Sequence, residues 1–148
     1  MKIISFALWG DNPKYLVGMQ RNLELVPIFY PDWKVYIYCG SDISNATIDI
    51  LNNCSSTEIF WNVMTKTGWT LMLDRFRAIL DPEVDVAIFR DADSRLSMRE
   101  KACVDEWLVS SCGVHAIRCH IDHTLPLLGG LWGIKKYSLP VDFKQMLE

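Results

Sequence analysis

A short apolar run that ends in two carboxylates constrains this chain more than any other feature. The run extends from Val84 to Arg90, is rich in Val, Ile and Phe, and follows Asp81-Pro82. Such a run predicts a strand buried on both faces, which is typical of a parallel sheet covered by helices. Asp91 and Asp93 come directly after it. The sequence therefore places an acidic pair at the carboxyl end of a strand, where open α/β sheets bind ligands.

Strand and helix patterns alternate along the whole chain. Strands are predicted over residues 2–9, 34–39, 58–63, 84–90, 114–119 and 127–134. Helices are predicted from Asn12-Pro13 to Pro27 and over residues 44–53, 69–80 and 97–110, with Ile50 and Leu51 facing inward in the second. Repeated β-α units with short connections predict the fold class α/β, a three-layer α/β/α arrangement with a mostly parallel sheet.

Length and composition narrow the class of protein. A chain of 148 residues that is 50% hydrophobic predicts one globular domain, residues 1–148. The net charge of −3 gives no sign of a nucleic-acid-binding surface. No apolar segment approaches the roughly 18 residues of a membrane span. Five irregularly spaced cysteines predict reduced, mostly buried thiols in a reducing compartment, and hence a cytoplasmic protein.

The acidic pair suggests a divalent metal. Residues i and i+2 of a strand point the same way, so Asp91 and Asp93 would converge if the strand geometry continued. Two hard oxygen ligands suit Mg²⁺ or Mn²⁺ and leave room for substrate phosphates, which suggests a nucleotide sugar. The tripeptide alone is also common in solvated turns, so the metal interpretation rests on its placement after a buried strand.

Two other segments are candidates for contact with a nucleotide. Trp9-Gly10 lies at the same predicted sheet edge, where Trp9 could stack on a base and the next helix could offer free N–H groups; an ordinary turn capped by Asn12 is the alternative. Arg75 lies outside the apolar stripe of its helix and could reach a diphosphate. A solvated surface arginine is the alternative for Arg75, and the favoured interpretation for Arg77.

Arg90 and Arg95 flank the acidic pair and could balance its charge or contact phosphate. Local ion pairing is the favoured interpretation, and it would contribute little to stability if the pairs are exposed.

Histidines and glycines gather near the end of the chain. His120 and His123 could supply a third metal ligand or an acid/base group, whereas His115 is expected within a strand. Cys119 with these histidines invites a zinc interpretation, but a structural zinc site usually needs four spaced ligands. Gly129 and Gly130 indicate either a close approach of a ligand or a bulge, and no G-x-G-x-x-G motif is present.

Several of these motifs occur in an order that resembles one group of enzymes. The segments concerned are 5–10, 30–35, 88–96, 99–101, 105–107 and 128–133. Together they resemble small GT-A-fold, D-x-D-containing glycosyltransferases of the bacterial and viral surface-polysaccharide type. The resemblance extends through nearly the whole chain and also implies the Rossmann-like fold of nucleotide-diphospho-sugar transferases.

The resemblance implies a transferase that moves a sugar from a nucleotide-diphosphate donor to a glycan or other acceptor, with Mn²⁺ or Mg²⁺ at the D-x-D motif. Asp93 would bind the ion, and Asp91 would contact the ion or the donor's ribose. The residues expected around the donor are Trp9, Gly10, Arg75, Asp91, Gly129 and Gly130, with His120 and His123 in a matching histidine segment. Cys119 departs from the pattern, because an Asp commonly stands there, and the group usually continues beyond the point where this chain ends.

Two alternatives remain open from the sequence. One is a C-terminally truncated or inactive domain that binds a nucleotide sugar without turning it over. The other is a phosphatase of the haloacid-dehalogenase type, which also has D-x-D after a strand. That motif normally lies near the start of the chain and is followed by a lysine and an acidic pair, and no Asp-Asp pair follows Asp93 here.

Overall fold

The computed structural model describes residues 1–148 and contains one six-stranded sheet in the order β3-β2-β1-β4-β6-β5. The strands are β1 (Lys2–Leu8), β2 (Lys34–Gly40), β3 (Ile59–Met64), β4 (Val86–Arg90), β5 (Val114–Ala116) and β6 (Leu131–Lys135). The first four are parallel, whereas β6 runs antiparallel to β4 and to β5. The predicted mostly parallel α/β sheet is confirmed.

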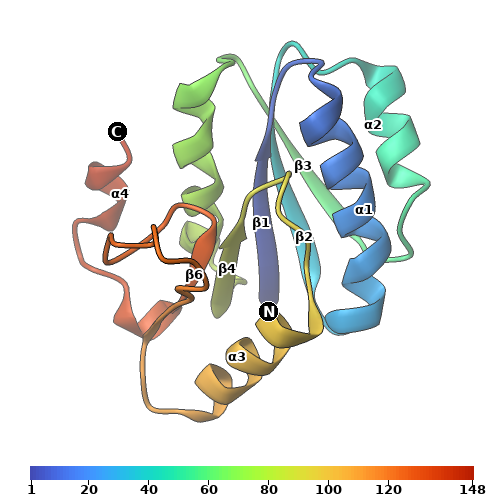
Figure 1. Ribbon diagram of the computed structural model, residues 1–148. Helices are drawn as coiled ribbons and strands as arrows, with labels where there is room; N and C mark the ends of the chain where they lie inside the picture. Colours follow the sequence, from blue (N-terminus) through green and yellow to red (C-terminus); the bar gives the residue numbers. More distant parts are fainter.

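Helices cover both faces of this sheet. α1 (Pro13–Phe29) and α2 (Asn45–Asn52) lie on one face, and the 3₁₀-helix η1 (Trp69–Leu80) and α4 (Phe143–Met146) lie on the other (Figure 1). α3 (Met98–Val109) contributes Val104 and Trp107 to the core on the α1 side, and the short η2 (Lys136–Ser138) follows β6. The predicted three-layer α/β/α arrangement is therefore confirmed.

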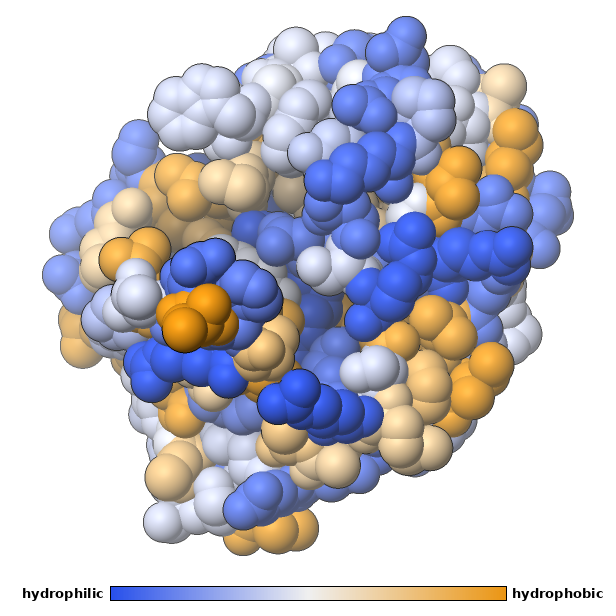
Figure 2. Space-filling model, in the orientation of Figure 1, coloured by the Kyte–Doolittle hydropathy of each residue, from blue (hydrophilic) through white to orange (hydrophobic).

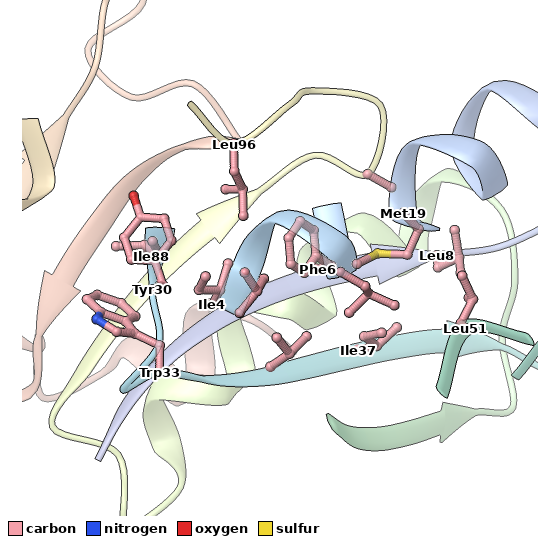
Figure 3. Close-up of a cluster of buried hydrophobic side chains, with 14 of the residues drawn as sticks. Ile4, Phe6, Leu8, Met19, Tyr30, Trp33, Ile37, Leu51, Ile88 and Leu96 are labelled. Carbon is pink, nitrogen blue, oxygen red and sulfur yellow. The ribbon is translucent and has the colours of Figure 1, made fainter. Parts of the chain in front are cut away.

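The alternation of side chains along the strands divides the core in two. In β1, Ile4 and Phe6 pack with Met19 of α1 on one face (Figure 3). Ile3 belongs to the cluster on the other face, against η1. Because β1, β2 and β4 are buried on both faces, their sequences show apolar runs rather than alternation.

The first helix does not end at Pro27 as predicted. α1 continues through it to Phe29, and the Tyr30 N–H closes the last turn on the carbonyl oxygen of Val26 at 2.7 Å. Val26 and Tyr30 are both fully buried. Packing on either side of the proline therefore outweighs the one backbone hydrogen bond that Pro27 cannot make.

The helix before β4 turns a different face to the sheet than predicted. Trp69 and Leu73, assigned to the apolar stripe, are 73% and 44% exposed, whereas Arg75 is buried with Ala78. A 3₁₀-helix has three residues per turn, so residues 75 and 78 lie above one another on the same face. The prediction that Arg75 lies off the buried face was wrong.

Three smaller predictions were also wrong. Ile50, expected to face inward, is 59% exposed, because only Leu51 of that helix is buried. β5 and β6 are shorter than predicted, so residues 117–130 form an irregular segment and Gly129-Gly130 lies in the turn before β6. Among the five free thiols, only Cys39 is buried, whereas Cys112 and Cys119 are exposed.

No helix combines the length and the apolar character that crossing a membrane requires.

Candidate functional site

The acidic pair lies in a loop at the carboxyl edge of the parallel strands. β4 ends at Arg90, so the strand alternation that predicted converging carboxylates does not extend to Asp91 and Asp93. Both nevertheless line the same cavity of about 280 Å³. Their side chains are 40% and 24% exposed, so the two carboxylates remain accessible to a ligand.

Helix α1 fixes the loop that carries the acidic pair through hydrogen bonds from one side chain, Asn22. The Asn22 amide donates to the carbonyl oxygens of Ala92 (3.2 Å) and Ser94 (2.7 Å) and accepts from the Leu96 N–H (3.1 Å). One turn earlier, Gly18 lies so close to the Ala92 carbonyl that a Cβ would collide with it. The role of Asn22 was not predicted from the sequence, although a polar residue among the apolar positions Met19, Leu23 and Val26 was the available signal.

The buried side chain of Arg75 forms an ion pair with Asp91. Its Nη1 lies 2.5 Å from Oδ1 of Asp91 and donates to the carbonyl oxygen of Arg90 at 3.0 Å. The side chain is only 2% exposed, yet its Nε and Nη2 have no partner. Buried donors are almost always satisfied, so a guanidinium with two free N–H groups at a cavity is suited to a ligand that brings acceptor oxygens.

Asp93 forms an ion pair with Lys14, which lies in the first turn of α1. Lys14 Nζ lies 2.6 Å from Oδ2 of Asp93. The hydrogen bond and the opposite charges raise the pKa of Lys14. Asp91 Oδ2 and Asp93 Oδ1 are not engaged by these pairs, so one oxygen of each carboxylate is free for a further ligand.

The two glycines before β6 allow the chain to pass close to the Arg75–Asp91 pair. A Cβ on Gly130 would collide with the Asp91 carboxylate, and one on Gly129 would lie 2.8 Å from Nη2 of Arg75. Neither glycine has a positive φ. Their small size, rather than their backbone freedom, is what this position requires.

Arg90 does not balance the charge of the acidic pair. It is 1% exposed, and its Nε lies 2.5 Å from Oε1 of Glu100, the third residue of α3. Its Nη1 also donates to the carbonyl oxygens of Phe89 (2.7 Å) and Trp132 (3.0 Å). The interpretation that Arg90 balances the charge of the acidic pair was therefore wrong. Arg90 forms an ion pair instead, as the favoured interpretation expected, but this pair with Glu100 is buried and fixes the start of α3 against the sheet.

Apart from the two aspartates and Arg75, the side chains that line their shared cavity are aromatic or apolar. Trp9, Tyr15 and Trp69 line it together with Ala7 and Met72. Trp9 and Tyr15 stack with ring centroids 6.2 Å apart.

The backbone N–H groups proposed as anion donors in the loop before α1 already have partners. Gly10 N–H donates to Oδ2 of Asp42 at 3.0 Å, and Lys14 N–H donates to the capping Asn12 side chain at 3.0 Å. These hydrogen bonds occupy the N–H groups of Gly10 and Lys14, whereas the Trp9 ring lines the cavity.

A second cavity of about 490 Å³ opens on the opposite side of Asp91. Its lining comes from the loop after β4, the start of α3 and the segment before β6, and includes Asp91, Arg95, Arg99, His123, Gly129 and Gly130. Figure 2 shows this face hollowed near its middle, with hydrophilic residues along much of the border. Asp91 therefore lies between two adjoining cavities of different character.

The two candidate histidines are placed differently. His123 lines the second cavity, and its Nδ1 accepts from Cys119 N–H at 3.2 Å, which leaves Nε2 free. His120 is not part of that lining; its Nδ1 instead accepts from the N–H of Asp122 at 3.2 Å. Cys119 Sγ lies 3.9 Å from the His123 ring nitrogen. This pair alone gives the zinc interpretation no support, because no three such ligands come together.

His115 lies in β5, as expected, and stacks on Trp107 with centroids 5.1 Å apart. Burial, assisted by the charge of Arg90, lowers the pKa of His115 to about 4. His115 is therefore neutral near pH 7.

The donor set of the site fits a hard divalent cation that binds together with a substrate. No three His, Cys, Asp or Glu side chains are grouped to hold a metal by themselves. Two carboxylates with free oxygens suit Mg²⁺ or Mn²⁺, since these ions often bind through one or two carboxylates plus substrate phosphates.

No protein-family model and no curated protein sequence matches this chain. Its fold is similar to that of solved nucleotide-diphospho-sugar transferases. A mannosyltransferase from Pyrobaculum calidifontis, solved with GDP-Man and Mn²⁺, matches with a TM-score of 0.63 at 15% identity over 90% of this chain. Glucosyl-3-phosphoglycerate synthase from Mycobacterium tuberculosis, solved with UDP, matches with a TM-score of 0.56 at 11% identity over 93% of this chain.

The same architecture also occurs in a nucleotidyl enzyme. 4-Diphosphocytidyl-2C-methyl-D-erythritol synthase from Anaerococcus prevotii matches with a TM-score of 0.62 at 12% identity, over 99% of this chain and 75% of its own. This chain spans 44% of the length of the mannosyltransferase and 57% of that of the glucosyl-3-phosphoglycerate synthase. The GT-A fold is therefore shown, and the chemistry is argued from the site.

Proposed function

We propose that residues 1–148 form a nucleotide-sugar-binding domain that transfers a sugar from a nucleotide-diphosphate donor to an acceptor with the help of Mn²⁺ or Mg²⁺. The observation that carries the proposal is the position of Asp91 and Asp93, which line one aromatic cavity at the carboxyl edge of a GT-A sheet. A metal-bound neighbour of the same fold supports the choice of cation.

Each residue at this edge has a distinct task in the proposed reaction. Trp9 stacks on the base, and the free oxygens of Asp91 and Asp93 hold the cation. Arg75 keeps Asp91 in place and offers its unpartnered Nη2 to the donor. Gly129 and Gly130 let the donor sugar approach this pair.

The bound cation would neutralise negative charge as the diphosphate leaves, an electrostatic contribution of several kcal/mol in metal-assisted reactions. The residues of the chain orient the donor. Because the donor is held at both its base and its phosphates, its anomeric carbon faces the second cavity. We propose His123 as the acid/base candidate in that cavity, because it has a free Nε2; His120 is the weaker candidate.

Other parts of the resemblance are retained as proposals. The acceptor is a glycan or another acceptor, the enzyme belongs to the surface-polysaccharide type, and the reaction takes place in the cytoplasm. The phosphatase alternative gains no support from the fold matches described above. A domain that binds a nucleotide sugar without turnover is the alternative that the experiment must separate.

The test is a panel of nucleotide sugars with Mn²⁺, Mg²⁺ or EDTA, read by thermal shift and by the released product. We expect a metal-dependent shift and release of nucleoside diphosphate in the wild type, and loss of both in Asp93→Asn, which keeps the shape but removes the ligand charge. Asp32→Asn is the matched control, because Asp32 is exposed and lies in the turn after α1.

Each outcome separates the alternatives. Metal-dependent binding without turnover identifies a binding domain. A parallel reaction with a nucleoside triphosphate and a sugar phosphate tests nucleotidyl transfer, which would release pyrophosphate instead. The proposal fails if Asp93→Asn turns over the donor as fast as the wild type.

A further inference from the structure

The cavity beyond Asp91 has a surplus of positive charge. Its two carboxylates each have a cation of their own: Asp91 pairs with Arg75, and Glu100 pairs with Arg90. The lining also contains Arg95 and Arg99, neither of which has a carboxylate partner.

These two arginines are free to bind. The Arg95 side chain donates only to the carbonyl oxygen of Asp93, at 3.2 Å, and the Arg99 guanidinium makes no hydrogen bond within the chain. Both are exposed at the cavity. A guanidinium binds carboxylate and phosphate groups in a bidentate manner, and two unpaired ones at a cavity mouth attract anions in particular.

The positive surplus continues into a neighbouring cavity of about 500 Å³, which shares Arg99 and Ile117 with the first. Arg118 lies in its lining and has no carboxylate partner, although it donates to the carbonyl oxygens of Leu125 (3.3 Å) and Pro126 (2.8 Å). One unpaired carboxylate, Glu106, opposes them. Three arginines against one acid leave the two adjoining cavities cationic.

The donor does not account for this charge. Its proposed site, with the aromatic lining, lies on the other side of Asp91, and the residues around its diphosphate already include Arg75 and Lys14. Arg95 and Arg99 instead line the side from which an acceptor reaches the anomeric carbon.

We infer that the acceptor carries an anionic group, a carboxylate or a phosphate, that Arg95 and Arg99 bind. The inference rests on the proposed function. In the reaction, the acceptor hydroxyl oxygen forms a bond to the anomeric carbon, and the bond between that carbon and the diphosphate oxygen breaks. The bonding electrons leave with the diphosphate, and the hydroxyl proton passes to the free Nε2 of His123, the proposed base, and from there to solvent.

The experiment uses acceptor pairs that differ only in charge: p-nitrophenyl glucuronide against p-nitrophenyl glucoside, and glucose 6-phosphate against glucose. Binding to the metal- and donor-loaded protein is measured by ligand-observed NMR, and transfer by release of nucleoside diphosphate. We expect the anionic member of at least one pair to bind at least tenfold more tightly. Its advantage should shrink as the salt concentration rises, because salt screens exposed charges.

The variants are Arg95→Gln and Arg99→Gln, with Arg21→Gln as the matched control, since Arg21 is an arginine of α1 paired with Glu24. We expect each cavity variant to weaken binding of the anionic probe about tenfold, with less than a twofold change in the KM for the donor.

The outcomes separate this inference from the function on which it rests. Equal binding of charged and neutral probes overturns the inference while the donor assay still reports on the function. A rise in donor KM in both variants, with acceptor binding unchanged, also overturns it, because the arginines then serve the donor diphosphate. If the wild type shows no metal-dependent donor binding, the function fails and the inference falls with it. A preference limited to the uronate pair or the phosphate pair identifies the anionic group.

Discussion

Removal of Arg90 should cost this protein more stability than any other single change to its charged residues. Arg90→Met leaves the Glu100 carboxylate 9% exposed and with only one remaining side-chain hydrogen bond, from the Tyr30 hydroxyl at 3.3 Å. The variant also removes the donors to the carbonyl oxygens of Phe89 and Trp132. Breaking a buried pair by removal of one partner typically costs about 3–5 kcal/mol, because the other charge stays buried.

The magnitude translates into a measurable shift in unfolding. For a chain of this size, about 2–4 °C is lost per kcal/mol, so a drop in Tm of roughly 6–20 °C is expected for Arg90→Met. Urea unfolding followed by tryptophan fluorescence gives the free energy of unfolding directly, since the chain has six tryptophans.

The double variant Arg90→Met/Glu100→Leu is the decisive control. Replacement of a whole buried pair by apolar side chains is often neutral or stabilising, so the double variant should recover most of the lost free energy. The reasoning is refuted if Arg90→Met costs less than about 1 kcal/mol, or if the double variant is as unstable as the single one.

Three further predictions follow from the same structure. Asn22→Leu should cost about 2–4 kcal/mol and weaken Mn²⁺ binding, because the loop oxygens lose a buried donor; a variant with wild-type urea midpoint and metal affinity contradicts this. His115→Phe should remove a pH dependence of the free energy of unfolding. In the folded protein His115 stays neutral down to a pKa of about 4, whereas in the unfolded chain it binds a proton below pH 6.5, so wild-type stability should fall by up to roughly 3 kcal/mol from pH 6.5 to 4. The Phe variant should keep the stack on Trp107 and show no such fall in urea titrations. Lys14→Met should tighten Mn²⁺ binding about two- to fivefold in calorimetry, because the ammonium no longer repels the cation or shares the negative charge of Asp93; weaker binding would show that Lys14 helps to shape the site.

The layered architecture could be predicted because it depends on patterns that are local in sequence. The Val84–Arg90 run, the Asn12-Pro13 cap and the Ser97 cap each report on a few neighbouring residues, and the structure contains the elements they predicted. The location of the acidic pair followed from the same patterns, because parallel strands have their carboxyl ends at one edge.

Charged side chains were predicted less well, because their partners are far away in the sequence. Arg75 was expected outside the buried face of its helix and is buried against Asp91, 16 residues later. A periodicity argument gave no means to distinguish a 3₁₀-helix from an α-helix, and the difference decides which face Arg75 occupies.

The sequence by itself determined that this chain forms a layered α/β fold with an acidic pair at the edge of its sheet, since burial on both faces of a strand leaves a contiguous apolar run. Only the tertiary structure decided which cations pair with which acids, that Asn22 holds the loop, and that Arg95 and Arg99 are left without partners. Those facts depend on distances between elements that are remote in sequence. The free energy of a charged side chain depends on how deeply it is buried and on which charged or polar groups lie beside it.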